Sequence, residues 1–242
     1  MVNPLRMNNS LHSEPSGILL VDKPKNKTSF SLVAALRRIL KVKKIGHAGT
    51  LDPFATGVMV MLIGKQFTKL SDKFLGADKE YQATLLLGVE TDTYDCDGQI
   101  LQQNAFVPSN EDLEKALKSF QGDVFQLPPM FSAKKKNGKK LYELARKGIS
   151  IEREPVKIHL TTELLNYQYP FVELRIRCTK GTYIRSIAHD LGQMLGCGAH
   201  LTALKRIRSG LFHIDSCLNG TLLDMPQCDA ITIKPFLIND LS

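Results

Sequence analysis

Apolar residues recur along this chain with two spacings, one typical of strands and one typical of helices. Residues 171–178 alternate between apolar and charged positions, which predicts a half-buried strand. Residues 184–195 carry apolar side chains three or four positions apart and end at Gly196, which predicts an amphipathic helix. A second alternating strand is expected at 81–87. The apolar run at 58–62 is compatible with a strand or with a buried helix.

Helix-capping signals and a short apolar run add three further elements. The run at 18–21 predicts a short buried strand. Thr28 or Ser29 can cap the helix that follows it, and Ser109 with Asp112 has the form of a capping box ahead of another helix. Strands and helices follow one another irregularly. We therefore predict an α+β fold with a mixed, largely antiparallel central sheet flanked by helices.

The chain of 242 residues is long enough for one domain with a small appendage. Residues 1–16 are polar and are expected to form a disordered lead-in, residues 17–215 a single domain, and residues 216–242 a short C-terminal tail. Within the domain, residues 128–155 are rich in Lys and Arg and contain Asn137–Gly138. This composition predicts a basic insertion that projects as a hairpin or lobe.

The composition indicates a basic protein with reduced cysteines. The chain has 32 Lys+Arg against 24 Asp+Glu, a formal charge of +8, which favours a polyanionic partner such as nucleic acid. Five cysteines, odd in number and without a C-x-x-C pair, indicate reduced thiols in a cytoplasmic protein and no disulfide framework or zinc site. The longest apolar run, residues 58–63, is too short to span a bilayer, and the N-terminus lacks the apolar core of a signal peptide. No membrane partner is expected.

Four basic segments have the composition of an RNA-handling surface. They are residues 41–44, 134–147, 180–185 and 205–208. Each alone is more simply a solvated face, but together they suggest a surface that follows phosphates.

The loop from Gly46 to Gly57 is the strongest candidate for chemistry. Asp52 precedes a proline, which favours extended backbone and a fixed direction for its carboxylate. A site that acts on a base needs a carboxylate, an aromatic surface and a cation, and Asp52, Tyr183 and Arg185 would supply these if they converge. Taken singly, they are more simply an acidic surface turn, a core-rim tyrosine and an arginine that caps a carboxylate.

The sequence G-H-A-G-T-L-D-P at residues 46–53 resembles the G-H-[TA]-G-[TS]-L-D-P motif of the bacterial tRNA pseudouridine synthase B family, which isomerises uridine 55 in the tRNA T-loop. Further segments resemble the family in its order: residues 17–24, 79–81, 91–98, 129–142, K-G-T-Y-I-R at 180–185, and 198–206. The resemblance extends over roughly residues 17–212, and it implies the pseudouridine synthase catalytic fold with an RNA-gripping insertion.

The resemblance also implies roles for individual residues. Asp52 is implied to be the catalytic nucleophile, and Arg185 its ion-pair partner. Four residues are implied to contact the target uridine: His47 in holding and flipping it, Tyr81 in stacking on it, Tyr183 in lining the pocket and removing a proton, and Leu204 in packing against the base. Asp92 and Lys23 are implied to support the site.

The implied partner is the T stem-loop of tRNA, and the implied enzyme is a monomer without a protein partner. The reaction breaks the C1′–N1 bond of a uridine and forms a C1′–C5 bond. Because nothing is oxidised and no group is transferred, we expect neither a metal nor a cofactor. Bacterial members typically carry a further C-terminal RNA-binding PUA domain. Only about thirty residues follow Arg208, so we expect that domain to be absent.

Three other functions remain open at this stage. A non-catalytic tRNA-binding or tRNA-folding chaperone would use the same basic and aromatic residues but would not need an Asp52–Arg185 pair. A catalytic subunit directed by a guide RNA is a second alternative. A metal-dependent nuclease built on Asp92, Asp95 and Asp97 is the third, although these acids are more typical of a turn. The sequence also leaves open whether Asp52 attacks C1′ or C6, or assists elimination to a glycal.

Overall fold

A computed structural model describes residues 14–132, 134–136 and 138–240. Most of the expected lead-in, residues 1–13, and Asn137 of the expected turn lie outside the described residues.

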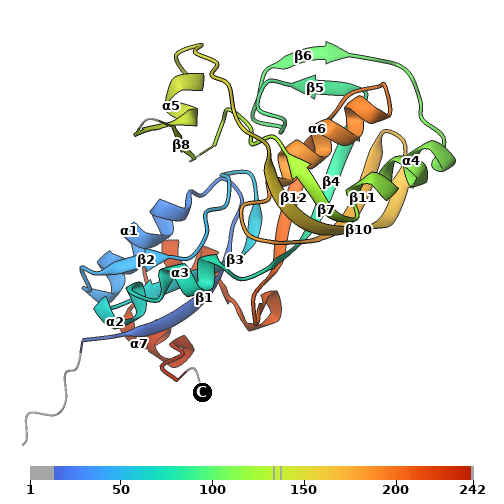
Figure 1. Cartoon of the computed structure of the whole chain (residues 1–242). Helices are drawn as coiled ribbons and strands as arrows, with labels where there is room; N and C mark the ends of the chain where they lie inside the picture. The colour runs from blue at the N-terminus through green and yellow to red at the C-terminus, as the bar shows by residue number, and fades with distance from the viewer. Residues whose placement is uncertain (1–13, 133, 137, 241–242) are drawn as a thin grey trace, which may run out of the picture.

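A ten-stranded mixed sheet runs through the molecule in the order β14-β1-β3-β12-β4-β11-β10-β7, with β2 paired to β3 and β13 to β12 (Figure 1). Its strands are β1 (Gly17–Lys23), β2 (Ile45–His47), β3 (Thr56–Ile63), β4 (Lys79–Leu87), β7 (Gly122–Gln126), β10 (Val156–Gln168), β11 (Phe171–Cys178), β12 (Ala199–Ser209), β13 (Phe212–His213) and β14 (Leu218–Asn219). Most neighbouring strands are antiparallel, and the pairs β1–β14 and β3–β12 are parallel. The prediction of an α+β fold with a largely antiparallel sheet is confirmed.

Short helices and two small hairpins complete the fold. The helices are α1 (Ser29–Leu40), α2 (Lys65–Thr68), α3 (Ser71–Leu75), α4 (Asn110–Leu117), α5 (Leu141–Ala145), α6 (Ile184–Met194) and α7 (Ala230–Ile233), with 3-10 turns η1 (Lys118–Phe120), η2 (Ile214–Ser216), η3 (Gly220–Asp224) and η4 (Lys234–Phe236). The hairpins pair β5 (Val89–Thr91) with β6 (Ile100–Gln103) and β8 (Lys135–Lys136) with β9 (Lys139–Lys140). Among the described residues, no helix is long and apolar enough to cross a bilayer.

The predicted helix starts are confirmed by their hydrogen bonds. The Thr28 hydroxyl accepts the Ser31 N–H at 3.0 Å and begins α1. The Ser109 and Asp112 side chains cap each other's backbone N–H at the start of α4, as a capping box requires. The run at 58–62, for which strand and helix were both open, lies in β3. It shows no alternation because β3 is almost completely buried on both faces.

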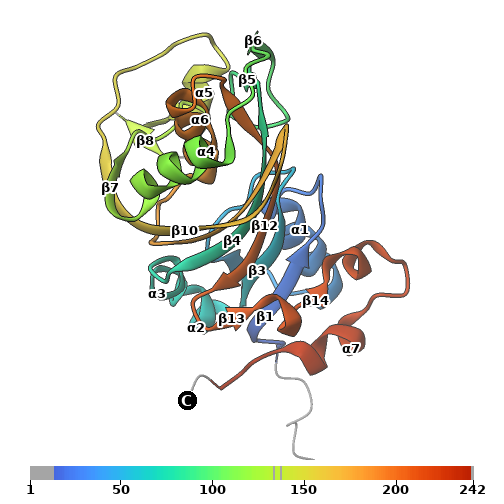
Figure 2. The ribbon, with the colours of Figure 1, turned by 90° about the vertical axis from the view of Figure 1, so that its right-hand side faces the viewer.

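The two halves of the sheet meet where β3 pairs with β12 over only two residue pairs. At this junction Gly57 has φ +105°, and a Cβ there would lie 2.2 Å from the Arg206 carbonyl oxygen. A glycine is therefore required for β12 to approach β3. On the far half, α6 packs against β12 and β4 and contacts α4 (Figures 1 and 2).

The segment expected to be a short tail, residues 216–242, contributes to the sheet. Within it, β14 pairs with β1, and Ile238 exchanges two backbone hydrogen bonds with Ile18, at 2.9 and 2.8 Å. The basic insertion contains β8, β9 and α5, which project beside the main body (Figure 1). The described part of the insertion thus forms the predicted hairpin.

Candidate active site

The loop that carries Asp52 connects β2 to β3 and is held in place from α1. The Ser29 hydroxyl, in the first turn of α1, accepts the Leu51 N–H at 3.1 Å. The Ala55 N–H donates to the Asp52 carbonyl at 3.1 Å and closes a turn around Pro53. The direction of the Asp52 side chain is therefore set by backbone contacts on both sides of it.

Lys23, the last residue of β1, binds the backbone of this loop. Its side chain is fully buried, and its ammonium donates to the carbonyls of Lys27 at 2.6 Å, Pro24 at 3.0 Å and Pro53 at 3.0 Å. Burial lowers the pKa of Lys23 to about 8, and the nearby Asp52 charge opposes that shift. Lys23 thus binds the backbone carbonyl of Pro53, next to Asp52, and its supporting role in the reaction stays a prediction.

Arg185 holds the Asp52 carboxylate at two points. Its Nε lies 2.9 Å from Asp52 Oδ2, and its Nη2 lies 3.5 Å from Asp52 Oδ1. The guanidinium is 7% exposed and also contacts Asp95 Oδ2 at 3.2 Å, the Thr93 carbonyl at 3.1 Å and the Phe131 carbonyl at 2.8 Å. A planar guanidinium with this many fixed acceptors cannot rotate freely, so it fixes the carboxylate that it binds.

The acid that orders Arg185 is Asp95, whereas Asp92 was the expected supporting residue. Asp92 accepts the Gln99 N–H at 2.8 Å and stabilises the turn instead. Asp95 is buried, accepts the Thr93 hydroxyl at 2.6 Å, and contacts Arg185. Burial raises the pKa of Asp95, and the Thr93 hydrogen bond and the Arg185 charge oppose the rise. No spacing signal in the sequence separates these two acids.

A cavity of about 650 Å³ lies above Asp52. Five of the predicted site residues line it together: Asp52, Tyr81, Tyr183, Arg185 and Leu204. The convergence that the sequence could only suppose is therefore present. Three predicted residues, His47, Lys23 and Asp92, do not line it.

His47 lies at the end of β2, beside the Asp52 loop. Its Nδ1 is buried and has no hydrogen-bond partner within the described part of the chain. Burial lowers the pKa of His47, and the charge of Arg206 adds to the shift. The ring is therefore neutral at physiological pH.

Of the three tyrosines that line the cavity, Tyr81 lies in β4 and Tyr183 at the start of α6. Burial raises the pKa of Tyr81, so its phenol stays protonated at neutral pH. Tyr183 is fixed through its backbone, because its N–H donates to Gln126 Oε1 at 2.8 Å and its carbonyl accepts from Gln126 Nε2 at 3.0 Å. Gln126 is 4% exposed and was missed from the sequence, where one glutamine at a strand end carries no signal.

Arg206 was expected in a phosphate-following segment, and for this residue the expectation is wrong. The side chain is 1% exposed, and it donates to the Val58 carbonyl at 2.7 Å and the Gly49 carbonyl at 3.2 Å beside the cavity. Alternation along β12 explains the difference, since Arg206 points inward while Lys205 is exposed on the other face. Arg206 thus ties the Asp52 loop to β3.

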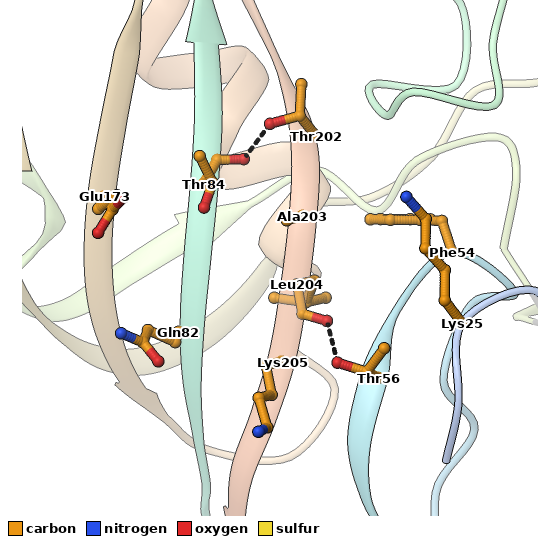
Figure 3. Close-up of a pocket in the computed structure, with 10 residues that line it drawn as sticks. All are labelled: Lys25, Phe54, Thr56, Gln82, Thr84, Glu173, Thr202, Ala203, Leu204 and Lys205. Atoms are coloured by element: carbon orange, nitrogen blue, oxygen red, sulfur yellow. Dashed lines mark hydrogen bonds between the residues drawn. The ribbon is translucent and has the colours of Figure 1, made fainter. Parts of the chain in front are cut away.

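A smaller cavity of about 280 Å³ lies on the opposite face of the sheet (Figure 3). Gln82 and Thr84 of β4 line it, whereas Tyr81, the residue before Gln82, lines the larger cavity. Leu204 lines both, so β12 forms the wall between them at this point.

Among the described residues, no group of three or more His, Cys, Asp or Glu side chains is arranged so that it could hold a metal ion. The five cysteines carry free thiols. Among the residues that line the larger cavity, Asp52 provides an oriented carboxylate, Arg185 a buried guanidinium, and Tyr81 and Tyr183 two of the three phenols.

Comparison with known proteins assigns this arrangement to a family. Residues 37–184 match the family model of the TruB family pseudouridylate synthase N-terminal domain, and residues 185–229 match that of the tRNA pseudouridylate synthase B C-terminal domain. The chain belongs to the TruB family of pseudouridylate synthases. It is therefore an isomerase, and the resemblance stated from its motifs is confirmed.

Named relatives agree with the family. The chain is 64% identical over 217 residues to a tRNA pseudouridine synthase B of Protochlamydia amoebophila, covering 88% of this chain and 83% of the relative. It is 58% identical over 221 residues to a tRNA pseudouridine synthase B of Chlamydia abortus, covering 91% and 93%.

A solved structure has the same fold. The crystal structure of a Cbf5-Nop10-Gar1 complex contains a chain 30% identical to this one, with a TM-score of 0.67. The match covers 86% of this chain and 54% of that chain. The predicted pseudouridine synthase fold is confirmed.

Proposed function

We propose that this enzyme isomerises uridine 55 in the T-loop of tRNA to pseudouridine, with Asp52 as the nucleophile. The observation that carries the proposal is the two-point contact of Arg185 with Asp52 beneath a cavity lined by Tyr81 and Leu204. The relatives named tRNA pseudouridine synthase B support the choice of substrate.

The first step is extraction of the target uridine from its stack, which costs a few kcal/mol. Stacking of the uracil on Tyr81 returns roughly 1–3 kcal/mol. Tyr183 and Leu204 line the same cavity and enclose the base. His47, beside the Asp52 loop, is proposed to help hold and flip the target nucleotide. A cavity of about 650 Å³ has room for a nucleotide.

The second step uses the carboxylate. Asp52 is 37% exposed at the cavity, and its two contacts with Arg185 fix the direction of the carboxylate. Attack by Asp52 at C1′ or at C6, or its assistance to elimination, leads to cleavage of the C1′–N1 bond. The base then turns and C5 bonds to C1′, and any bond between Asp52 and the nucleoside breaks so that the carboxylate is regenerated. A proton then leaves C5. Tyr183 and Asp52 are the groups proposed to take it, because both line the cavity.

RNA is held outside the cavity by exposed lysines. Lys41, Lys43 and Lys44 precede the Asp52 loop, and Lys180 precedes the Tyr183 turn. If these lysines contact phosphates, the logarithm of the binding constant falls with the logarithm of the salt concentration by about 0.7 per phosphate on single strands. As part of the same proposal the enzyme works as a monomer in the cytoplasm, and gel filtration tests the oligomeric state.

Turnover and binding of a T stem-loop by Asp52→Asn test the proposal. We expect pseudouridine formation to be abolished while RNA affinity stays within a few-fold of wild type. Normal turnover by the variant would contradict the role of Asp52. Absence of turnover by the wild type, with RNA binding intact, would favour the non-catalytic chaperone.

A further inference from the structure

Ser132 lines the active-site cavity and has a buried, unpaired hydroxyl. The residue is 4% exposed and lines the cavity together with Asp52 and Arg185. Its Oγ has no hydrogen-bond partner among the residues that the structure describes. Buried hydroxyls are almost always hydrogen-bonded in native proteins, so an exception beside a substrate cavity indicates a partner that arrives with the substrate.

The backbone around Ser132 fixes where this hydroxyl lies. The Ser132 N–H donates to the Met130 carbonyl at 2.9 Å, and the Ser132 carbonyl accepts the Tyr142 N–H at 3.0 Å. The preceding residue, Phe131, gives its carbonyl to Arg185 at 2.8 Å. Ser132 is thus tied on one side to α5 and, through Phe131, on the other to the guanidinium that binds Asp52. Its hydroxyl is the polar group that has no partner among the described residues.

We propose that the Ser132 hydroxyl hydrogen-bonds to the target nucleotide, at a uracil carbonyl or at the ribose 2′-hydroxyl, and is a specificity-determining residue of this site. The inference rests on the proposed function, because it requires a uridine in the cavity. A hydroxyl both donates and accepts, so it suits either group. No covalent step is assigned to Ser132.

Ser132→Ala is expected to lower activity without lowering the stability of the fold. In the free enzyme the hydroxyl is unpaired, so Ser132→Ala removes nothing that stabilises the fold, and the melting temperature should stay unchanged or rise. In the complex the same change leaves a polar atom of the substrate without a partner in a site closed to water. We expect kcat/KM on a T stem-loop to fall about 10- to 100-fold.

Ser186 provides a matched control. It is 2% exposed, and its hydroxyl donates to the Leu127 carbonyl at 3.3 Å, so the protein itself satisfies it. Ser186→Ala should therefore lower the melting temperature and leave kcat/KM within about threefold of wild type. The two variants are predicted to show opposite patterns.

Modified substrates identify the partner atom. T stem-loops that carry 2′-deoxyuridine, 2-thiouridine or 4-thiouridine at the target position are assayed with wild type and with Ser132→Ala. With the substrate that lacks the partner atom, the wild type should lose activity and the substitution should cost nothing further.

Additive losses with all three substrates, or a Ser132→Ala enzyme within twofold of wild type, would overturn the inference. A Ser132→Ala enzyme that loses melting temperature as Ser186→Ala does would show a structural role and would also overturn it. Failure of the wild type to isomerise the unmodified stem-loop would instead refute the proposed function.

Discussion

Replacement of Arg185 by methionine should destabilise the enzyme by about 3–5 kcal/mol at pH 7.5, the cost of removing one partner from a buried ion pair. The loss comes mainly from Asp95, whose side chain is 5% exposed and would keep its charge without a cation. Asp52 is 37% exposed and would remain partly solvated, so it adds little to the loss in stability. Turnover should disappear, because the Asp52 carboxylate loses both of its contacts with Arg185.

Arg185→Lys separates charge from geometry. Arginine makes five contacts here, two to Asp52 and one each to Asp95, Thr93 and Phe131. A lysine ammonium has three donors, so at least two contacts are lost. At about 0.5–1.5 kcal/mol each, the expected cost is roughly 1–3 kcal/mol. We expect kcat to fall more than RNA affinity, since only the aim of Asp52 changes.

The deficit of Arg185→Met should depend on pH. Burial raises the pKa of Asp95 even beside Arg185, and removal of the cation would raise it further. An acid whose pKa in the folded state lies above its unfolded value of about 3.9 weakens the fold as the pH rises, because the native state binds more protons. The part of the deficit that comes from the Asp95 charge should be small near pH 4.5 and complete at pH 7.5, whereas the lost contacts with the Thr93 and Phe131 carbonyls cost the same at both.

Urea denaturation of wild type, Arg185→Met and Arg185→Lys at both pH values provides the measurement. A deficit for Arg185→Met below about 1 kcal/mol at pH 7.5, or one of equal size at the two pH values, would refute this account of the network.

Three further comparisons test other parts of the structure. Gly57→Ala places a Cβ 2.2 Å from the β12 backbone at φ +105° and should lower the free energy of unfolding by about 3–5 kcal/mol. Gly122 has φ +77° and nothing within 4 Å of the position of an added Cβ, so Gly122→Ala should lower it by about 1 kcal/mol in the same denaturation assay. Asp95→Asn should lower kcat/KM at least about tenfold and Asp92→Asn less than about threefold; equal effects would place Asp95 outside the network. Lys23 has a pKa of about 8 in the folded state against about 10.4 in the unfolded state. The stability of the wild type relative to Lys23→Met should therefore rise by up to about 3 kcal/mol between pH 7 and pH 10.5. A stability difference that does not change with pH would contradict the burial of Lys23 as a cation.

Periodicity predicted those elements that have one buried face. The alternating strand β11, the amphipathic helix α6 and the capping box of α4 all lie where the pattern places them. It could not decide β3, because burial on both faces removes the alternation that identifies a strand. The parallel pairing of β14 with β1 was also missed, because two residues at a sheet edge leave no pattern in the sequence.

The residues of the site were likewise predicted only in part. The motif around Asp52 and the resemblance together named five residues that line the cavity, although Asp52 and Arg185 are far apart in the chain. The sequence did not show that Asp95, and not Asp92, contacts Arg185, or that the Arg206 side chain is buried. Both outcomes depend on which polar group has a buried partner in the folded structure. Gln126 escaped notice for the same reason.

Position-resolved mapping of pseudouridine on full-length tRNA transcripts, treated in parallel with wild type and Asp52→Asn, tests the central claim most directly. The account predicts pseudouridine at uridine 55 with the wild type and none with the variant, at equal protein concentration and with EDTA present. Modification at uridine 55 by the Asp52→Asn enzyme, or wild-type modification only at other uridines, would contradict it.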